Sequence, residues 1–128
     1  LPQVPELVES FRRAGCDVAL HVGGDPRSLT AAAGLTVYRI VQEALANAAR
    51  HARARTIQVK MMFADQALHL QISDDGQGFA PPERLSSLSQ DGHFGLMGMQ
   101  ERAELIGAQL RIHSSPGQGT TIDIALPT

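Results

Sequence analysis

The stretch Ala67-Leu68-His69-Leu70-Gln71-Ile72-Ser73-Asp74-Asp75 alternates apolar and polar side chains with the period of a half-buried β-strand. Asp74 continues the apolar phase, which aims its carboxylate toward the core layer. Because a buried carboxylate is costly unless it meets strong donors, two interpretations stay open. Either the strand ends before Asp74, which then caps a turn ahead of Gly76, or Asp74 accepts hydrogen bonds from a ligand. Gly76 and Gly78 fit both, since glycine permits positive φ and close approach of a flat ligand.

The same alternation recurs in four other segments, and helical spacing of apolar residues recurs in three. Strands are expected at 18–22, 57–63, 68–72, 110–112 and 122–126, and helices at about 4–14, 33–52 and 96–106. Every expected strand has one apolar and one polar face. A sheet with one wet face and helices on the other is a two-layer α/β sandwich. We therefore predict a mixed five-stranded sheet with three helices on one face.

This pattern disfavours the doubly wound nucleotide fold, whose strands are buried on both faces. The sequence also has no Gly-x-Gly-x-x-Gly after its first expected strand and no glycine-rich phosphate loop ending in Lys-Ser/Thr. A nucleotide would therefore bind between the helices and the sheet.

Composition agrees with one compact domain over residues 1–128. The 128 residues are 43% hydrophobic and carry a formal charge of −2, which allows a full core and argues against a nucleic-acid surface. A single cysteine, Cys16, excludes an internal disulfide and a cysteine-rich metal site. No apolar run is long enough to span a bilayer, so no direct membrane contact is expected. Because the chain starts at Leu1, we expect it to be a piece of something longer.

The expected helix over 33–52 carries a polar wall beside its apolar stripe. At about 100° per residue, the wall consists of Arg39, Glu43, Asn47, Arg50 and His51. Charges alone would fit a solvated face. Asn is a poor residue for a helix interior because its amide competes with the backbone, whereas a hard cation accepts an amide oxygen readily. The wall is therefore a candidate ligand surface.

Two further glycine clusters follow the one at Asp74, namely Gly95-Leu96-Met97-Gly98 and Gly117-Gln118-Gly119-Thr120-Thr121. A lone glycine cluster is usually a turn. The order of these clusters after the polar helix points instead to a nucleotide pocket assembled from four places in the chain. Residues 80–93 are polar and irregular, and they are the best candidate for a mobile lid.

These four pieces, in their order and spacing, resemble the boxes of the catalytic ATP-binding domain of bacterial sensor histidine kinases, over essentially the whole chain. Residues 38–52 resemble the N box, and 74–79, 95–102 and 117–121 resemble the boxes that follow it. The likeness is to the nitrate/nitrite-sensor subfamily, which works with LuxR-like response regulators. It implies the Bergerat ATP-binding fold with ATP and Mg²⁺ as ligands.

The resemblance also implies roles for individual residues. Asn47 would bind Mg²⁺, catalytic Glu43 would lie beside the metal and its waters, and Asp74 would accept from the adenine amino group. Arg50 and His51 would lie near the phosphates. The other implied ATP-binding residues are Gly76, Gly78, Phe94, Gly95, Leu96, Gly98, Met99, Gly117, Gly119, Thr120 and Thr121.

The chain departs from the family pattern in three places. Asp75 stands where many relatives have Asn, a tolerated variant, and the lid lacks a separate phenylalanine box, with Phe94 as a partial substitute. No His sits in a phosphoacceptor helix. The resemblance thus implies a cytoplasmic, monomeric catalytic domain that donates the γ-phosphate of ATP to a His on the dimerisation domain of the same kinase, and so indirectly to a response regulator.

Three alternatives remain open at this point. Glu43 could act as a general base for water attack, as in gyrase-like and chaperone-like ATPases of the same fold. The chain could be a serine kinase of the anti-sigma type, or a degenerate module that senses ATP without transferring phosphate.

Overall fold

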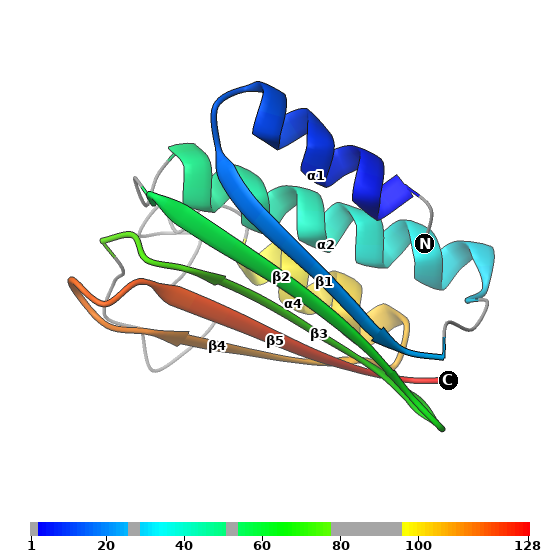
Figure 1. The fold of residues 1–128 in the computed structure, drawn as a ribbon. Helices are drawn as coiled ribbons and strands as arrows, with labels where there is room; N and C mark the ends of the chain where they lie inside the picture. Colours follow the sequence, from blue (N-terminus) through cyan, green and yellow to red (C-terminus); the bar gives the residue numbers. More distant parts are fainter. Residues whose placement is uncertain (1–2, 26–28, 51–53, 78–95) are drawn as a thin grey trace.

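The computed structural model describes residues 3–25, 29–50, 54–77 and 96–128. In chain order its elements are α1 (Gln3–Arg13), β1 (Asp17–Gly24), α2 (Ala31–Arg50), β2 (Thr56–Ala64), β3 (Ala67–Asp74), α4 (Leu96–Leu105), β4 (Gln109–Ser114) and β5 (Thr120–Pro127). The strands form one sheet in the order β1-β2-β3-β5-β4. Figure 1 shows α1, α2 and α4 on the same side of this sheet. The predicted two-layer sandwich is confirmed.

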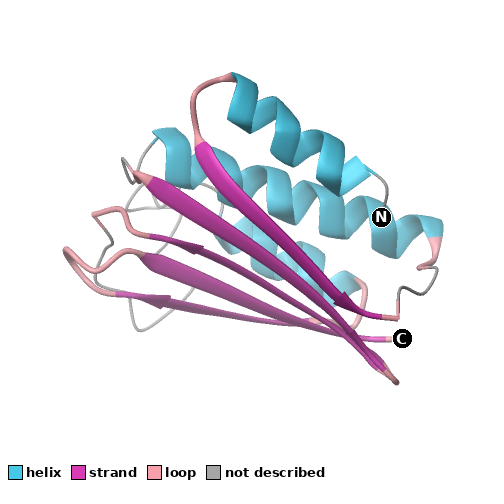
Figure 2. Cartoon of the chain, in the orientation of Figure 1, coloured by secondary structure: helices cyan, strands magenta, loops and turns pink. Residues whose placement is uncertain are grey.

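The sheet is mixed, because only its first pair of strands is parallel. β1 pairs with β2 in parallel, whereas β2 with β3, β3 with β5, and β5 with β4 are antiparallel. The short link between β2 and β3 makes a hairpin, in which Ala64 pairs with Ala67. The last strand of the chain therefore lies inside the sheet, between β3 and β4 (Figure 2).

The core fills the space between the helices and one face of the sheet. Alternate residues of β2 and β3 are buried on this face, as the apolar phase predicted. The apolar stripe of α2 covers them with Val37, Ile40, Val41, Ala44, Leu45 and Ala48, all at most 3% exposed. From α4, Met99 and Ala103 are fully buried against the same core. No helix of the described residues is long and apolar enough to cross a membrane.

A glycine follows shortly after the end of α1 and after the end of α4. Gly15 and Gly107 have φ of 100° and 75°, in the left-handed region that favours glycine. The N–H of the residue after each glycine donates to the carbonyl five residues earlier, from Cys16 to Phe11 and from Ala108 to Ala103.

The first turn of α2 is capped by Thr30, whose hydroxyl accepts from the N–H of Ala33 at 3.1 Å. The helix begins at Ala31, two residues before the predicted start at Ala33.

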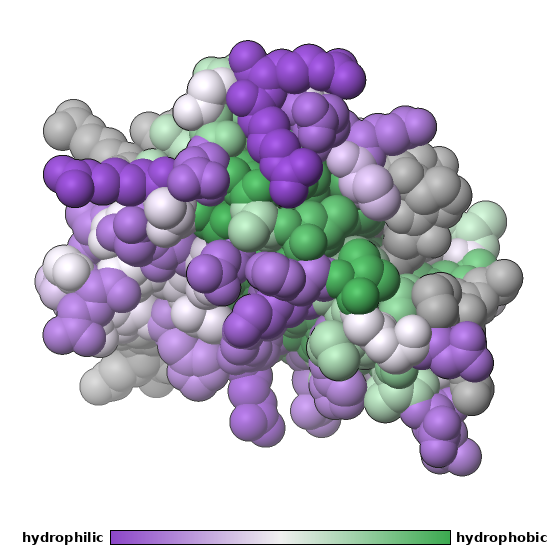
Figure 3. All heavy atoms as spheres, viewed as in Figure 1, coloured by the Kyte–Doolittle hydropathy of each residue, from purple (hydrophilic) through white to green (hydrophobic). Residues whose placement is uncertain are grey.

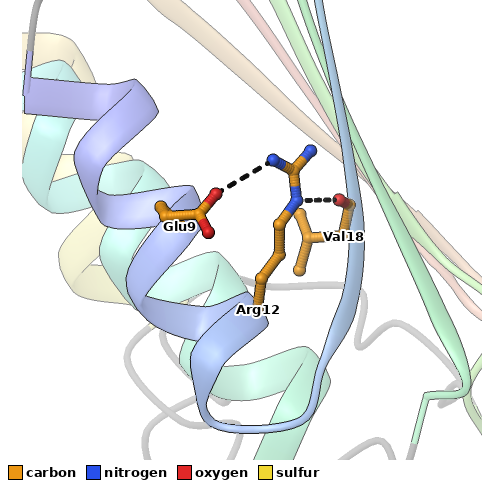
Figure 4. A network of polar contacts seen from close by, with 3 residues as sticks. All are labelled: Glu9, Arg12 and Val18. Atoms are coloured by element: carbon orange, nitrogen blue, oxygen red, sulfur yellow. Dashed lines mark hydrogen bonds and ion pairs between the residues drawn. The ribbon is translucent and has the colours of Figure 1, made fainter.

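Arg12 connects α1 to the edge strand β1 through a hydrogen bond. Its Nε donates to the carbonyl of Val18 at 2.7 Å, and its Nη1 lies 3.2 Å from Oε2 of Glu9 (Figure 4). Further along β1 the apolar phase is no longer covered, because Val22 is 52% exposed. The apolar face expected for this strand is thus buried only where α1 packs on it.

The opposite face of the sheet is open and polar. Figure 3, whose view takes in the helices and the sheet together, shows hydrophilic side chains around a hydrophobic patch near the middle of the molecule. A shallow hollow on the open face is lined by residues of β2, β3, β4 and β5, among them Lys60, His69, Gln71, Arg111 and Asp123. Of the residues predicted to bind ATP, none that the structure describes lines this hollow.

Candidate functional site

The four motif segments meet at one end of the sandwich. Figure 1 shows the end of α2, the end of β3 and the starts of α4 and β5 gathered at the same end of the molecule. Two of them are joined directly, because Asp74 is the register partner of Thr120 on β5. A site built here draws on parts of the chain that are far apart in sequence.

Asp74 is the last residue of β3, so the interpretation that the strand ends before it is wrong. Its side chain is half-buried, and its Oδ1 accepts from the N–H of Gly76 at 2.8 Å. The N–H of Thr120 also hydrogen-bonds this carboxylate. The residue therefore continues the strand and also stabilises the turn behind it. The alternative, that Asp74 accepts hydrogen bonds from a ligand, stays a prediction.

The carboxyl of Asp74 pays a desolvation cost in this position. Burial raises its pKa above the usual range, and the nearby charge of Asp75 adds to the rise. The hydrogen bonds from Gly76 and Thr120 lower the pKa, but by less. A half-buried carboxylate whose charge the fold disfavours is a candidate acceptor for a ligand's donor group.

The last glycine cluster packs tightly against this strand end. Gly119 is buried with φ of 78°, and a Cβ built on it would overlap the carbonyl oxygen of Asp74. The N–H of Gly117 donates to the carbonyl of Gln77 at 2.6 Å. Ser114 completes the turn by donating to the carbonyl of Gly119 at 3.0 Å. The glycine clusters at 74–77 and 117–121 thus interlock through their backbones.

Asp75 makes contacts that the sequence did not reveal. Its Oδ1 accepts from the backbone N–H groups of Arg55 at 2.8 Å and Thr56 at 2.9 Å. These bonds, that from Thr56 foremost, lower the pKa of the Asp75 carboxyl below its usual range. In the sequence, an Asp followed by Gly indicates only an ordinary turn. The one sign that Asp75 makes further contacts was its position next to Asp74.

The polar wall of α2 lies beside the core, where its helical phase put it. Glu43 and Asn47 are half-buried and Arg39 is exposed. Arg50 ends the helix, but its side chain lies outside what the structure describes, and so does all of His51. The structure thus describes two of the four helix residues assigned to metal and phosphates.

The remaining predicted site residues are described only in part. Gly78, Phe94 and Gly95 lie outside the described residues, as does the whole lid predicted over 80–93. Leu96 opens α4, where Gly98 is half-buried and Met99 is fully buried in the core. Thr120 and Thr121 are half-buried at the start of β5, and the hydroxyl of Thr120 lies 2.9 Å from that of Ser114.

The fold and the four motif segments agree with the protein family that the sequence matches. The chain belongs to the histidine kinase-, DNA gyrase B-, and HSP90-like ATPases, whose family profile matches residues 32–128.

Among curated proteins, the chain is similar to sensor kinases. An uncharacterized sensor-like histidine kinase of Chloroflexus aurantiacus is 41% identical over 92 residues, 71% of this chain and 15% of that protein. The signal transduction histidine-protein kinase/phosphatase DegS of Brevibacillus brevis is 39% identical over 93 residues, 73% of this chain and 23% of that protein. The sensor protein VraS of Staphylococcus aureus is 38% identical over 91 residues, 71% of this chain and 25% of that protein. The chain therefore spans a quarter or less of these relatives.

Solved structures share the fold. The blue-light activated histidine kinase of Erythrobacter litoralis EL346 matches with a TM-score of 0.74 at 21% identity, covering 97% of this chain and 40% of that one. The ATP binding domain of PrrB from Mycobacterium tuberculosis matches with a TM-score of 0.71 at 21% identity, covering 95% and 88%. The second match covers most of both chains.

Proposed function

We propose that residues 1–128 form the single catalytic ATP-binding domain of a longer two-component sensor histidine kinase. The observation that carries the proposal is the half-buried Asp74 carboxylate at the end of the sheet where the motif segments meet. It offers a charged acceptor to a ligand that enters between the helices and the sheet. The amino group of adenine is the matching donor. Family membership and the kinase names of the relatives support the same function.

Each end of the proposed site has its own residues. ATP supplies the transferable phosphoryl group, and Mg²⁺ neutralises charge on its phosphates. Asn47 would give an oxygen to the metal, with Glu43 one helical turn earlier beside the metal and its waters. Arg50, His51 and the start of α4 would serve the phosphates. The proposed pocket is completed by Gly76, Gly78, Phe94, Gly95, Leu96, Gly98, Met99, Gly117, Gly119, Thr120 and Thr121.

The proposal includes partners that act in sequence. The γ-phosphate would pass to a His on the dimerisation domain of the same kinase, and from there to a response regulator. The resemblance of residues 38–52 to the nitrate/nitrite-sensor subfamily favours a LuxR-like regulator. Because such a kinase uses ATP and transfers phosphate to a response regulator in the cytoplasm, we propose that the domain lies there.

The chain alone is expected to bind ATP as a monomer and to show no stable self-phosphorylation, because none of its five His residues belongs to a phosphoacceptor helix. Adding the dimerisation domain of its parent kinase should produce label on that partner, at a rate limited by the encounter of two untethered pieces. The measurement is incubation with labelled ATP followed by acid and base treatment, since phosphohistidine is acid-labile and base-stable. Acid-stable label on the chain would indicate a serine kinase instead.

The same assay separates transfer from hydrolysis. Steady phosphate release by the isolated chain, abolished in Glu43→Gln, would make it an ATPase and contradict the proposal. Absence of transfer to the partner despite ATP binding would leave only a nucleotide-sensing module.

A change of Asn47 to Ala is expected to abolish the tightening of ATP binding by Mg²⁺ while sparing much of the binding without metal. The reason is that the amide oxygen of this half-buried residue would be a ligand of the metal rather than of adenine. The measurement is ATP affinity with and without Mg²⁺. Asn47→Asp is the matched control, because it keeps an oxygen at the same place. Equal Mg²⁺ enhancement in wild type and Asn47→Ala would remove Asn47 from the metal site.

A further inference from the structure

We propose that Asp75 is a positioning residue, which holds the strand end that carries Asp74 so that Asp74 meets the adenine amino group. The inference rests on the proposed ATP site. It assigns a task to a residue that does not itself contact the nucleotide.

Asp75 extends the connection between β2 and β3 beyond the last pair of their register. The register ends where Ile57 pairs with Asp74. One residue further, Oδ1 of Asp75 accepts the N–H groups of Arg55 at 2.8 Å and Thr56 at 2.9 Å. The N–H of Asp75 itself donates to the carbonyl of Thr56 at 3.3 Å. Three hydrogen bonds therefore tie the residue after Asp74 to the start of β2.

These bonds supply one of two lateral supports for Asp74. On the β5 side, the strand end is held by the N–H of Thr120 and by the close backbone contact with Gly119. On the β2 side, the support beyond Ile57 comes from Asp75. Without it, the turn that donates the N–H of Gly76 to Asp74 could move away from β2.

Strand geometry keeps Asp75 out of the pocket. Successive side chains point to opposite faces of a sheet, and Asp74 continues the phase of the buried residues Leu70 and Ile72. Asp75 follows it with an exposed side chain. Its effect on adenine must therefore pass through the backbone to Asp74.

Two substitutions of Asp75 distinguish a role through the position of the turn from a role through the charge of the carboxylate. The Oδ1 of Asn is an acceptor at the same distance from the backbone, so Asp75→Asn retains the bonds from the N–H groups of Arg55 and Thr56. It loses the charge and exchanges the second carboxylate oxygen for an amide group, which can still donate to the hydroxyl of Thr56. Asp75→Ala loses both the bonds and the charge. The charge of Asp75 also raises the pKa of Asp74, so a role through charge would make the two variants alike. A role through position makes Asp75→Asn resemble the wild type.

The first arm of the test is the affinity of each protein for ATP and for purine riboside triphosphate, which lacks the amino group. Asp75→Ala should bind ATP about three- to tenfold more weakly, the size of a partly lost hydrogen bond, and should bind the control nucleotide as the wild type does. Asp75→Asn should match the wild type with both nucleotides. Asp123→Ala is the matched surface control, because its carboxylate accepts from Gln71 at 2.9 Å on the open face and away from the motifs.

The second arm needs no nucleotide. Amide hydrogen exchange at Thr56 and Gly76 should accelerate in Asp75→Ala but not in Asp75→Asn. In an Asp74→Ala background, Asp75→Ala should no longer change the affinity for ATP, because the residue through which it acts is gone. If Asp75→Ala does not fold, Asp75→Glu replaces it, since its side chain is one methylene longer and shifts the carboxylate from the position that serves both amides.

Three outcomes would overturn the inference. They are unchanged ATP affinity in Asp75→Ala, equal weakening of both nucleotides, and equal effects of the Ala and Asn variants. Failure of the wild type to bind ATP would instead overturn the proposed function, and the exchange measurement would still report whether Asp75 holds the turn.

Discussion

Replacing Asp74 by Asn is expected to weaken ATP binding roughly ten- to a hundredfold, because a hydrogen bond to a charged acceptor contributes about 1.5–3 kcal/mol. The fold should survive, since Asn keeps an oxygen for the N–H of Gly76. Burial raises the pKa of Asp74, which means that the folded protein disfavours its charge. The free energy of unfolding of Asp74→Asn at neutral pH should therefore equal or exceed that of the wild type.

Titration calorimetry and urea unfolding measure the two quantities, and the pH dependence adds a further check. The adenine amino group needs the ionised carboxylate, so the affinity of the wild type should rise with pH through the raised pKa of Asp74. Phosphate ionisation affects both proteins alike and cancels in their ratio, which should approach one in acid. Unchanged affinity in Asp74→Asn at neutral pH would remove this residue from the site.

Gly119→Ala should be the most destabilising of the substitutions considered. Its φ of 78° lies where L-residues are strained, and the added Cβ would overlap the carbonyl of Asp74 and crowd the backbone of Asp75. Because neighbouring backbone cannot swing aside like a flexible side chain, we expect a loss of about 2–4 kcal/mol in the free energy of unfolding. The shift of the Asp74 backbone should also weaken ATP binding in the protein that remains folded.

Gly117→Ala is the matched control for this change. Its φ of 79° is nearly the same, but a Cβ there would have nothing within 4 Å. It should therefore show only the conformational strain, about 1 kcal/mol. Urea unfolding compares the two directly. Equal losses in both variants would mean that the contact with Asp74 contributes nothing to stability.

The architecture could be predicted from sequence because burial follows periodicity. The alternation at Leu68, Leu70 and Ile72 and the stripe on α2 each identify one buried face, and two such faces have few ways to pack. Strand order could not be predicted, since alternation says which face is buried and nothing about neighbours. For the same reason, the exposure of Val22 could not be predicted. An apolar residue on an edge strand is buried only where another element covers it, and alternation does not say where that is.

The sequence could single out a residue of the candidate site where the chemistry of a side chain conflicts with its expected burial. Asp74 in an apolar phase signals an unusual carboxylate, and the structure confirms that it is half-buried and hydrogen-bonded. The role of Asp75 was out of reach, because its donors at Arg55 and Thr56 are 20 and 19 residues away and meet it only through the register of β2 and β3. The requirement for glycine at position 119 was out of reach for the same reason. It arises because a Cβ there would overlap the backbone at the end of β3.

The position of β5 inside the sheet, between β3 and β4, constrains the order in which a ribosome-bound chain can fold. β4 pairs only with β5 in the described sheet, and β3 keeps an open edge until β5 arrives. During synthesis, residues 54–114 can therefore form a hairpin and an unpartnered strand but not a closed sheet. The carboxylate of Asp74 gains the N–H of Thr120 only at that last step. A nascent chain should consequently remain unable to bind nucleotide until its final strand has left the exit tunnel, and until then the edge of β3 is available to chaperones.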